Sequence, residues 1–315
     1  MTTRLPEENI VPYGEEYVQS SDRHPAAFAS EWLRRRGWDR RRIALELGSY
    51  YLGVPAARAF AAALGTEPLD GSLLVNWVRS IKSAAELAVM KEAGRIVETV
   101  MADALERARP GVREYDLVAD ICRAQIRGSG PDVPGFYTST PPLVLSGERS
   151  VAPHLPWTGR VLERGQMTSL EIMGNRHRYQ VPLGRSVFLG VPPASLVKRA
   201  EGAVTVLSET LSGIRPGMTA ENVAELWRTG AERFGLAKEA RVGYSIGIAY
   251  PPTGGELTVS LRRGDRTVLE SGMCLHLIPA LYAAEGSLVI TEPFYLTATG
   301  AEPFCHLERR LFVRE

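Results

Sequence analysis

RARPGVREYDLVADICRA (residues 107–124) and GIRPGMTAENVAELWRTG (residues 213–230) are two versions of one pattern. In each, a helical segment stops at Arg-Pro-Gly, a polar turn follows, and a second amphipathic segment begins. Strand-like segments follow both copies: residues 140–147 and 169–190 after the first, then residues 243–250, 272–282 and 287–300 after the second. Two such units predict a duplicated α+β domain, with a curved antiparallel sheet, helices packed outside it and a cleft on its concave face.

The first 80 residues differ from this pattern. Residues 26–37 predict a helix, residues 41–53 a strong strand, and residues 55–65 a second helix that ends at a glycine. A long amphipathic helix then starts at Ser83, because Ser83 with Glu86 three residues later forms a capping box. We therefore predict a domain boundary near residue 80, with domains over 1–80 and 81–315.

The bulk composition excludes several classes of function. The chain has 315 residues, of which 44% are hydrophobic and 23% charged, and its net charge is +1. It therefore lacks the basic field that nucleic-acid or anionic-membrane binding needs, and we interpret the arginine-rich run 34–42 as a solvated helix end. No apolar run reaches the ~18 residues of a membrane span, and the polar, acidic N-terminus is no signal peptide.

The three cysteines, Cys122, Cys274 and Cys305, are widely spaced and odd in number. Their spacing is not that of a metal site, so reduced thiols fit best. Together with the absence of a targeting segment, this predicts a soluble, cytoplasmic protein.

SLEIMGNRHRYQVPLGRSVFLG (residues 169–190) predicts two strands joined by a polar turn, with unusual residues in both. Glu171 is the one acid inside the first, apolar strand, and Pro182 and Gly184 interrupt the second. A buried carboxylate is costly unless it is paired, protonated or turned toward a ligand. Glu171 is therefore either in a salt bridge with Arg178 or Arg185, or part of a functional site.

The repeat, the preceding VRSIKSAAELAVMKEAGRI and this strand pair resemble the pita-bread fold of creatinase, methionine aminopeptidase and Xaa-Pro dipeptidase, over residues 75–300. Within that superfamily, phrases from most of the chain resemble ectoine hydrolases, a creatinase-like branch: VPYGEEYVQSSDRHP, LLVNWVRSIKS, APHLPWT, RVGYSIGIAYPP, SLRRGD and HLIPALY. Measured against that resemblance, residues 1–80 form a creatinase-type N-terminal domain of about half the usual length.

The resemblance also bears on metal binding. The metallopeptidase members hold two metal ions with two Asp, one His and two Glu side chains. The corresponding positions in this chain are Glu171, Pro182, Tyr244, Ile278 and Thr291. One carboxylate and a phenol do not make a dinuclear site for hard cations. We therefore expect no metal and no other cofactor.

Four residues are candidates for catalysis. The resemblance implies that His154 transfers protons, a role that suits an imidazole titrating near neutrality, although a loop histidine bonded to the backbone remains an alternative. Glu171 is a candidate nucleophile, base or counter-charge. His276 and Glu292 lie in apolar strands beside former metal positions, and strand alternation leaves open whether Glu292 faces away.

Five residues are candidates for substrate binding: Arg185, Tyr244, Tyr250, Glu256 and Tyr137. Arg185 is a candidate partner for a substrate carboxylate, and Tyr244 replaces the metal-binding histidine. Tyr250 and Glu256 belong to YPPTGGE, which is either a loop over the substrate or a plain turn. Thr253 and Gly254 there replace an Asp and a Trp that are usual in ectoine hydrolases, so a wall of the pocket has changed.

The function expected from this resemblance is metal-independent hydrolysis of a non-peptide C–N bond in a small, polar nitrogen compound, such as a cyclic amidine or a guanidine. A biosynthetic reaction on a related heterocycle is a variant of it. The alternatives are a metal-dependent Xaa-Pro dipeptidase or aminopeptidase, and a catalytically silent binding protein. The resemblance further implies a homodimer, with no nucleic-acid or membrane partner.

Overall fold

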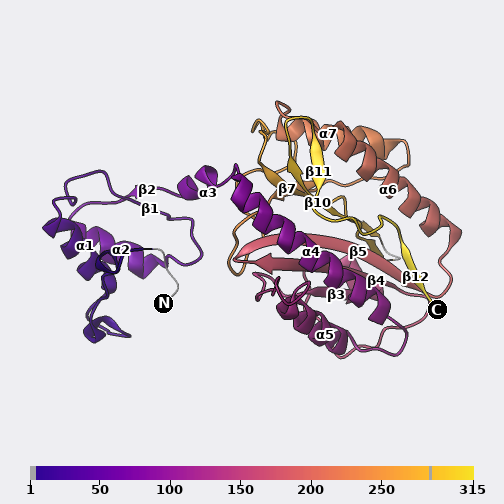
Figure 1. The fold of residues 1–315 in the computed structure, drawn as a ribbon, viewed down its shortest axis with the longest axis horizontal. Helices are drawn as coiled ribbons and strands as arrows, with labels where there is room; N and C mark the ends of the chain where they lie inside the picture. Colours follow the sequence, from indigo (N-terminus) through magenta and orange to yellow (C-terminus); the bar gives the residue numbers. More distant parts are fainter. Residues whose placement is uncertain (1–4, 284–285) are drawn as a thin grey trace. The chain divides into compact units, whose positions relative to one another are not determined.

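The computed structural model describes residues 5–283 and 286–315 (Figure 1). The chain divides into two compact units, Met1–Val75 and Asn76–Glu315, a few residues before the boundary predicted at residue 80. None of the helices among the described residues combines the length and apolarity needed to cross a bilayer.

The first unit is small, and its regular structure is mainly helical. It contains two 3-10 turns, two α-helices and two short parallel strands: η1 (Glu7–Asn9), η2 (Glu15–Tyr17), α1 (Pro25–Arg35), β1 (Ala44–Leu45), α2 (Val54–Leu64) and β2 (Leu69–Asp70). The strong strand predicted over 41–53 was wrong, because only two of its residues pair with β2. The Ser49 N–H donates back to the Glu46 carbonyl, so the chain turns immediately after β1.

The second unit contains the duplicated helix pairs. A short helix, α3 (Leu74–Val78), precedes the first pair, α4 (Ala84–Arg107) and α5 (Glu114–Arg127); α6 (Ala194–Gly213) and α7 (Ala220–Glu232) form the second. The capping box predicted at Ser83 is present, and α4 lies across the strands that follow it (Figure 1). Gly111 and Gly217, the glycines of the two Arg-Pro-Gly turns, have φ of 93° and 88°, a left-handed conformation that favours glycine at both places.

The α+β fold is as predicted, but the strands form two four-stranded sheets at the centre of this unit where one antiparallel sheet was expected, and β12 pairs with β5 in parallel. One has the order β12-β5-β4-β3 and the other β11-β10-β7-β6. The strands of the first are β3 (Leu143–Ser146), β4 (Met167–Arg176), β5 (Tyr179–Leu189) and β12 (Phe312–Arg314). The strands of the second are β6 (Gly243–Ser245), β7 (Cys274–Leu277), β10 (Glu292–Leu296) and β11 (Ala301–Pro303), and a separate hairpin pairs β8 (Leu281–Ala283) with β9 (Gly286–Leu288).

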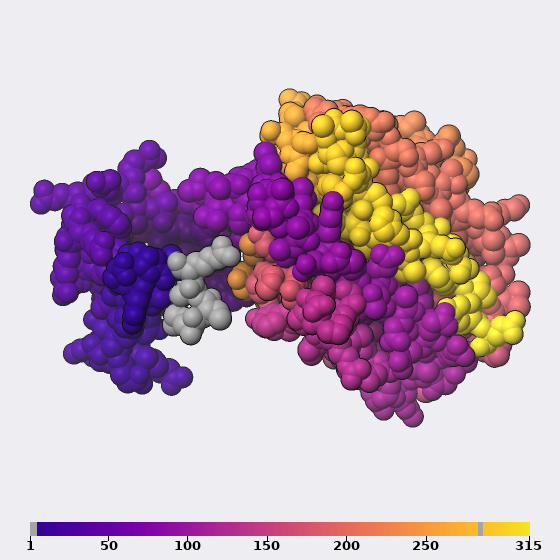
Figure 2. Space-filling view, viewed as in Figure 1, coloured from indigo at the N-terminus to yellow at the C-terminus, as the bar shows by residue number. Residues whose placement is uncertain are grey.

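The two sheets meet where the Thr291 N–H donates to the Gly184 carbonyl at 3.1 Å. Around this junction the C-terminal segment runs beside α4, as the neighbouring yellow and purple surfaces in Figure 2 show. A Cβ on Gly94, in the middle of α4, would lie 2.8 Å from the Phe304 carbonyl oxygen. Glycine at this position therefore lets the helix approach the C-terminal segment closely.

The β4–β5 hairpin sets the register of the site. Its two-residue turn, His177-Arg178, has φ of 49° and 71°, the conformation that matches the twist of the flanking strands. This turn pairs Glu171 with Gly184 and Met173 with Pro182.

Pro182 fits in this strand for a backbone reason. The N–H groups of Gln180 and Gly184, two residues before and after it, point away from β4 and bind the Gly247 carbonyl and the Thr291 hydroxyl. The nitrogen of Pro182 points toward the same edge, because strand residues alternate. The β4–β5 ladder therefore loses no hydrogen bond to the proline.

Candidate functional site

Two of the predicted catalytic residues line one cavity. It encloses about 270 Å³, counting the open solvent at its mouth. Glu171 comes from the middle of β4, and His154 from the loop after the 3-10 helix η3 (Gly147–Val151). The other lining residues are Leu143, Leu145, Pro153, Ser169, Tyr282, Ser287 and Val289.

The Glu171 carboxylate has no hydrogen bond or ion pair with any residue in the described parts of the chain, and Glu171 is partly exposed and lines the cavity. Burial raises the pKa of its carboxyl group, and the charges of His154 and Lys238 oppose that rise. A carboxylate with a raised pKa is a suitable base near neutral pH.

The salt bridges considered for Glu171 are absent, because both arginines have other partners. The Arg178 guanidinium lies 4.5 Å from the centre of the Tyr137 ring and 4.4 Å from that of Tyr250. Arg185 pairs with Glu292 at 3.3 Å. Glu171 is thus available to a ligand.

Serine hydroxyls, which the sequence analysis missed, lie beside Glu171 in the cavity. Ser169 Oγ donates to the Ser287 carbonyl at 2.7 Å, lies 2.9 Å from Ser287 Oγ and 3.2 Å from Ser186 Oγ. Ser169 is two residues before Glu171 on β4, so strand alternation alone indicates that it shares the face of Glu171.

A chain of hydrogen bonds joins three residues at or next to the former metal positions. His276 Nε2 lies 2.7 Å from the Thr291 hydroxyl, and His276 Nδ1 lies 3.4 Å from the Tyr244 hydroxyl. Burial, together with the charges of Arg185 and Arg241, lowers the pKa of His276 to about 3. The imidazole is therefore neutral and bonded within the protein, and it does not line the cavity.

The donor atoms at these positions do not fit a pair of divalent cations. Pro182 and Ile278 carry no ligand atom, and the Thr291 hydroxyl is engaged by His276 and by the Gly184 N–H at 2.7 Å. Burial and the charge of Glu171 raise the pKa of Tyr244, so its phenol stays protonated. Across residues 5–283 and 286–315, no three His, Cys, Asp or Glu side chains converge as metal ligands.

Arg185 and Glu292 lie away from the cavity. Both are fully buried, and Glu292 also accepts a hydrogen bond from Arg309 at 2.8 Å. Gly184 is the residue opposite Glu171, so alternation turns the next side chain, Arg185, to the other face of the sheet. The structure therefore does not bring this arginine to a substrate beside Glu171.

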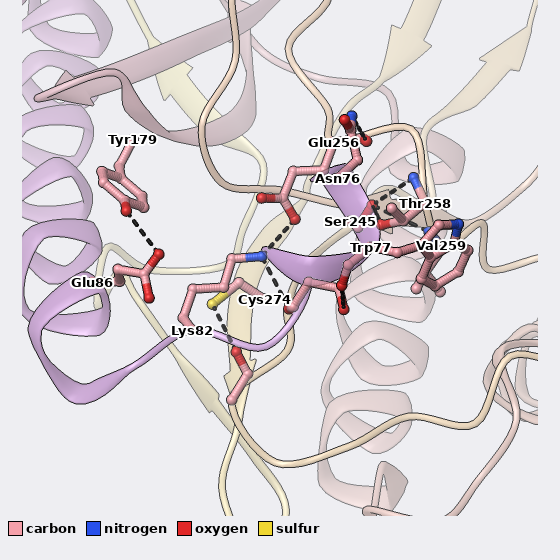
Figure 3. A network of polar contacts seen from close by, with 12 residues as sticks. Asn76, Trp77, Lys82, Glu86, Tyr179, Ser245, Glu256, Thr258, Val259 and Cys274 are labelled. Atoms are coloured by element: carbon pink, nitrogen blue, oxygen red, sulfur yellow. Dashed lines mark hydrogen bonds and ion pairs between the residues drawn. The ribbon is translucent and has the colours of Figure 1, made fainter. Parts of the chain in front are cut away.

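Glu256 is likewise held inside the protein. Its carboxylate lies 2.5 Å from Lys82 Nζ, with both side chains buried, and Figure 3 shows the two pointing toward one another. The Asn76 side-chain amide donates to the Glu256 carbonyl at 2.8 Å. The end of the YPPTGGE segment is thus anchored by an ion pair, while Tyr250 and Tyr137 cover Arg178 and do not line the cavity.

Two further cations, Lys238 and Arg241, come from the loop between α7 and β6. Lys238 Nζ donates to the Ala280 carbonyl at 3.2 Å and lies 5.8 Å from the centre of the Tyr282 ring. Burial lowers the pKa of Lys238 to about 8, although Glu171 acts to raise it. The Arg241 guanidinium lies 4.6 Å from the centre of the Tyr244 ring. Arg241 opens the phrase RVGYSIGIAYPP, but no periodicity or motif marks Lys238 in the sequence.

Comparison with known proteins places this geometry in a family. Residues 88–301 match the model of metallopeptidase family M24. The chain is 41% identical to an uncharacterized hydrolase/peptidase of Sinorhizobium fredii, over all of this chain and 80% of that relative. An ectoine hydrolase of Halomonas elongata is 35% identical over 98% of the chain and 79% of its own length.

Solved structures show the same fold at lower identity. An X-Pro aminopeptidase from Thermotoga maritima matches with a TM-score of 0.81 and 18% identity, over 96% of this chain and 84% of that one. An Xaa-Pro dipeptidase from Bacillus anthracis matches with a TM-score of 0.80 and 23% identity, over 93% and 80%. The fold, the family model and the relatives that match along nearly the whole of this chain agree, and the chain therefore belongs to metallopeptidase family M24.

Proposed function

We propose that this protein hydrolyses a non-peptide C–N bond in a small, polar nitrogen compound, a cyclic amidine or a guanidine, without a metal ion. The observation that carries the proposal is that Glu171, without a protein partner in the described chain, shares a cavity with His154, while the family's metal positions lack ligands. The 35% identical relative that is named an ectoine hydrolase supports this substrate class.

The proposed reaction adds one water molecule across the C–N bond. The Glu171 carboxylate engages the electrophilic carbon, either directly or through a water molecule that it deprotonates. The oxygen ends on the carbon, the C–N bond breaks, and His154 delivers the proton to the departing nitrogen.

The test is incubation of the purified full chain with ectoine and with creatine, with mass spectrometry of the products. From ectoine, whose ring would open, we expect one product heavier than the substrate by one water molecule. From creatine, which is not cyclic, we expect two fragments whose masses add up to the substrate plus one water molecule. Glu171→Gln and His154→Asn should each lower the rate by about a hundredfold or more. Glu201→Gln, an equivalent change at an exposed position on α6, should leave the rate unchanged.

Other outcomes would contradict the proposal. Cleavage of Xaa-Pro dipeptides that depends on added Mn²⁺ would assign the protein to the metallopeptidases of its family. A compound that raises the melting temperature but yields no product would indicate a binding protein instead.

A further inference from the structure

The loop between α7 and β6 carries two cations, Lys238 and Arg241, that no salt bridge in the described chain holds. Within the part of the chain that the structure describes, neither Lys238 nor Arg241 forms a salt bridge. The Lys238 side chain donates one hydrogen bond, to the Ala280 carbonyl, and the Arg241 side chain donates none to any described residue. The charge of Arg241 acts on Lys238, so the two repel each other. The charge of Glu171 acts on Lys238 in the opposite direction, but the two form no ion pair, so an anion bound between the two cations would lessen their repulsion.

Each of these cations lies over an aromatic ring, and one of the two rings lines the cavity. Lys238 stands over Tyr282, whose side chain lines the cavity with Glu171. Arg241 stands over Tyr244, whose ring packs edge-on against His276 with centroids 5.6 Å apart. A cation over an aromatic face keeps its N–H groups at the ring's edge free for another ligand.

We propose that Lys238 and Arg241 form a carboxylate-binding subsite, which selects a small zwitterion whose C–N group faces Glu171. The claim that the ligand is a zwitterion rests on the proposed function, whereas the claim that the subsite binds an anion does not. Lys238 uses one of its three N–H donors on Ala280, and a guanidinium carries five donors suited to a carboxylate. Arg185, the residue first expected to hold a carboxylate, is occupied by Glu292.

The anion site is tested first without any substrate. The full chain is labelled with an amine-reactive succinimidyl acetate in sodium acetate and in sodium chloride of equal ionic strength, and peptides are quantified by mass spectrometry. We expect acetate to slow the labelling of Lys238 about threefold, as a site about two-thirds occupied would. Labelling of Lys198, an exposed lysine on α6, should not change. Arg241→Met should remove the protection.

Equal labelling of Lys238 in the two salts would overturn the subsite, whatever the outcome for ectoine. The same is true if protection persists in the Arg241→Met variant, because Arg241 would then hold no part of the anion.

The selection of a zwitterion is tested with two pairs of probes. Ectoine is compared with the same ring lacking its carboxylate, and creatine with methylguanidine, by calorimetric titration. We expect the carboxylate to tighten binding about tenfold or more in the wild type, and much less in Lys238→Met. Lys198→Met should behave as the wild type. Equal affinities for the two members of each pair would refute the selection of a zwitterion. If none of the four compounds binds, the proposed function is refuted as well. The labelling experiment would still show whether the anion site exists.

Discussion

At the scale of single residues, His276 illustrates how burial sets chemistry. Its imidazole is fully buried between two hydroxyl groups, and its pKa falls from 6.5 to about 3. Histidine in this state neither gains nor loses a proton near neutral pH. It therefore acts as a fixed hydrogen-bonding group between Tyr244 and Thr291, unlike His154, which lines the cavity.

This neutral imidazole predicts a pH dependence of stability. Below pH 6.5 the unfolded chain binds a proton at His276 that the folded chain does not bind, so the free energy of unfolding falls as the pH falls toward 3. Between pH 6.5 and 5 the loss from this residue should be about 2 kcal/mol. Urea denaturation at these two pH values measures the free energy of unfolding. We expect the His276→Gln variant to lack this part of its dependence on pH. An unchanged slope in the variant would mean that the folded imidazole titrates normally.

At the scale of elements, the β4–β5 hairpin separates what the sequence could predict from what it could not. Two strands with Glu171 in the first were predictable, because apolar runs and a polar turn suffice. The register was not, since it depends on a two-residue turn in which neither residue is glycine. Without the pairing of Glu171 with Gly184, Arg185 could not be assigned to the opposite face.

Gly184 itself predicts a local sensitivity. A Cβ there would lie 2.6 Å from Val289 Cγ1 and 2.9 Å from Thr291 Cγ2, so Gly184→Ala must push apart β5 and the segment before β10. Overpacking of this kind costs about 1–3 kcal/mol, which chemical denaturation would measure. Gly159→Ala is the control, because its Cβ would meet only a Tyr115 ring carbon at 3.6 Å. Equal effects of the two changes would show that β5 has room there.

The YPPTGGE segment depends on a pairing that no local pattern reveals, because Lys82 and Glu256 are far apart in sequence. Lys82→Met leaves the Glu256 carboxylate buried without its counter-charge and should cost about 3–5 kcal/mol of unfolding free energy. Replacing both residues, Lys82→Met with Glu256→Leu, should recover much of that loss. Asp103→Asn, which breaks an exposed pair with Arg107, should cost less than about 1 kcal/mol. A double variant no more stable than the single one would contradict this account.

At the scale of the whole molecule, the duplication was visible in the sequence. The turn after each long helix needs a residue in the left-handed conformation, so both halves keep a glycine, as part of Arg-Pro-Gly. The candidate site was only partly predictable. Glu171 and Tyr244 belong to different sheets, and what unites them is the contact of Thr291 with Gly184 and His276. Lys238, Arg241 and Tyr282 come from a loop and a hairpin. The last two lie in phrases that carry the resemblance, but their place beside the site was not predictable, since folding alone brings these segments together.

The positions at which the resemblance implies metal ligands span both sheets, and the residues found there predict how the intact protein responds to chelation. In a metal-dependent relative, bound cations stabilise the folded state by mass action, and their removal lowers the melting temperature. Here the positions hold Glu171, a protonated phenol, a bonded hydroxyl and two side chains without donors, so they offer little to bind. We expect elemental analysis of the purified chain to find less than one divalent ion per molecule. Dialysis against EDTA should leave both the melting temperature and the turnover of any amidine substrate unchanged, and added Mn²⁺ should raise neither. Two tightly bound ions per chain, or activity that EDTA removes and Mn²⁺ restores, would show that oxygen atoms of Tyr244 and Thr291 ligate after all.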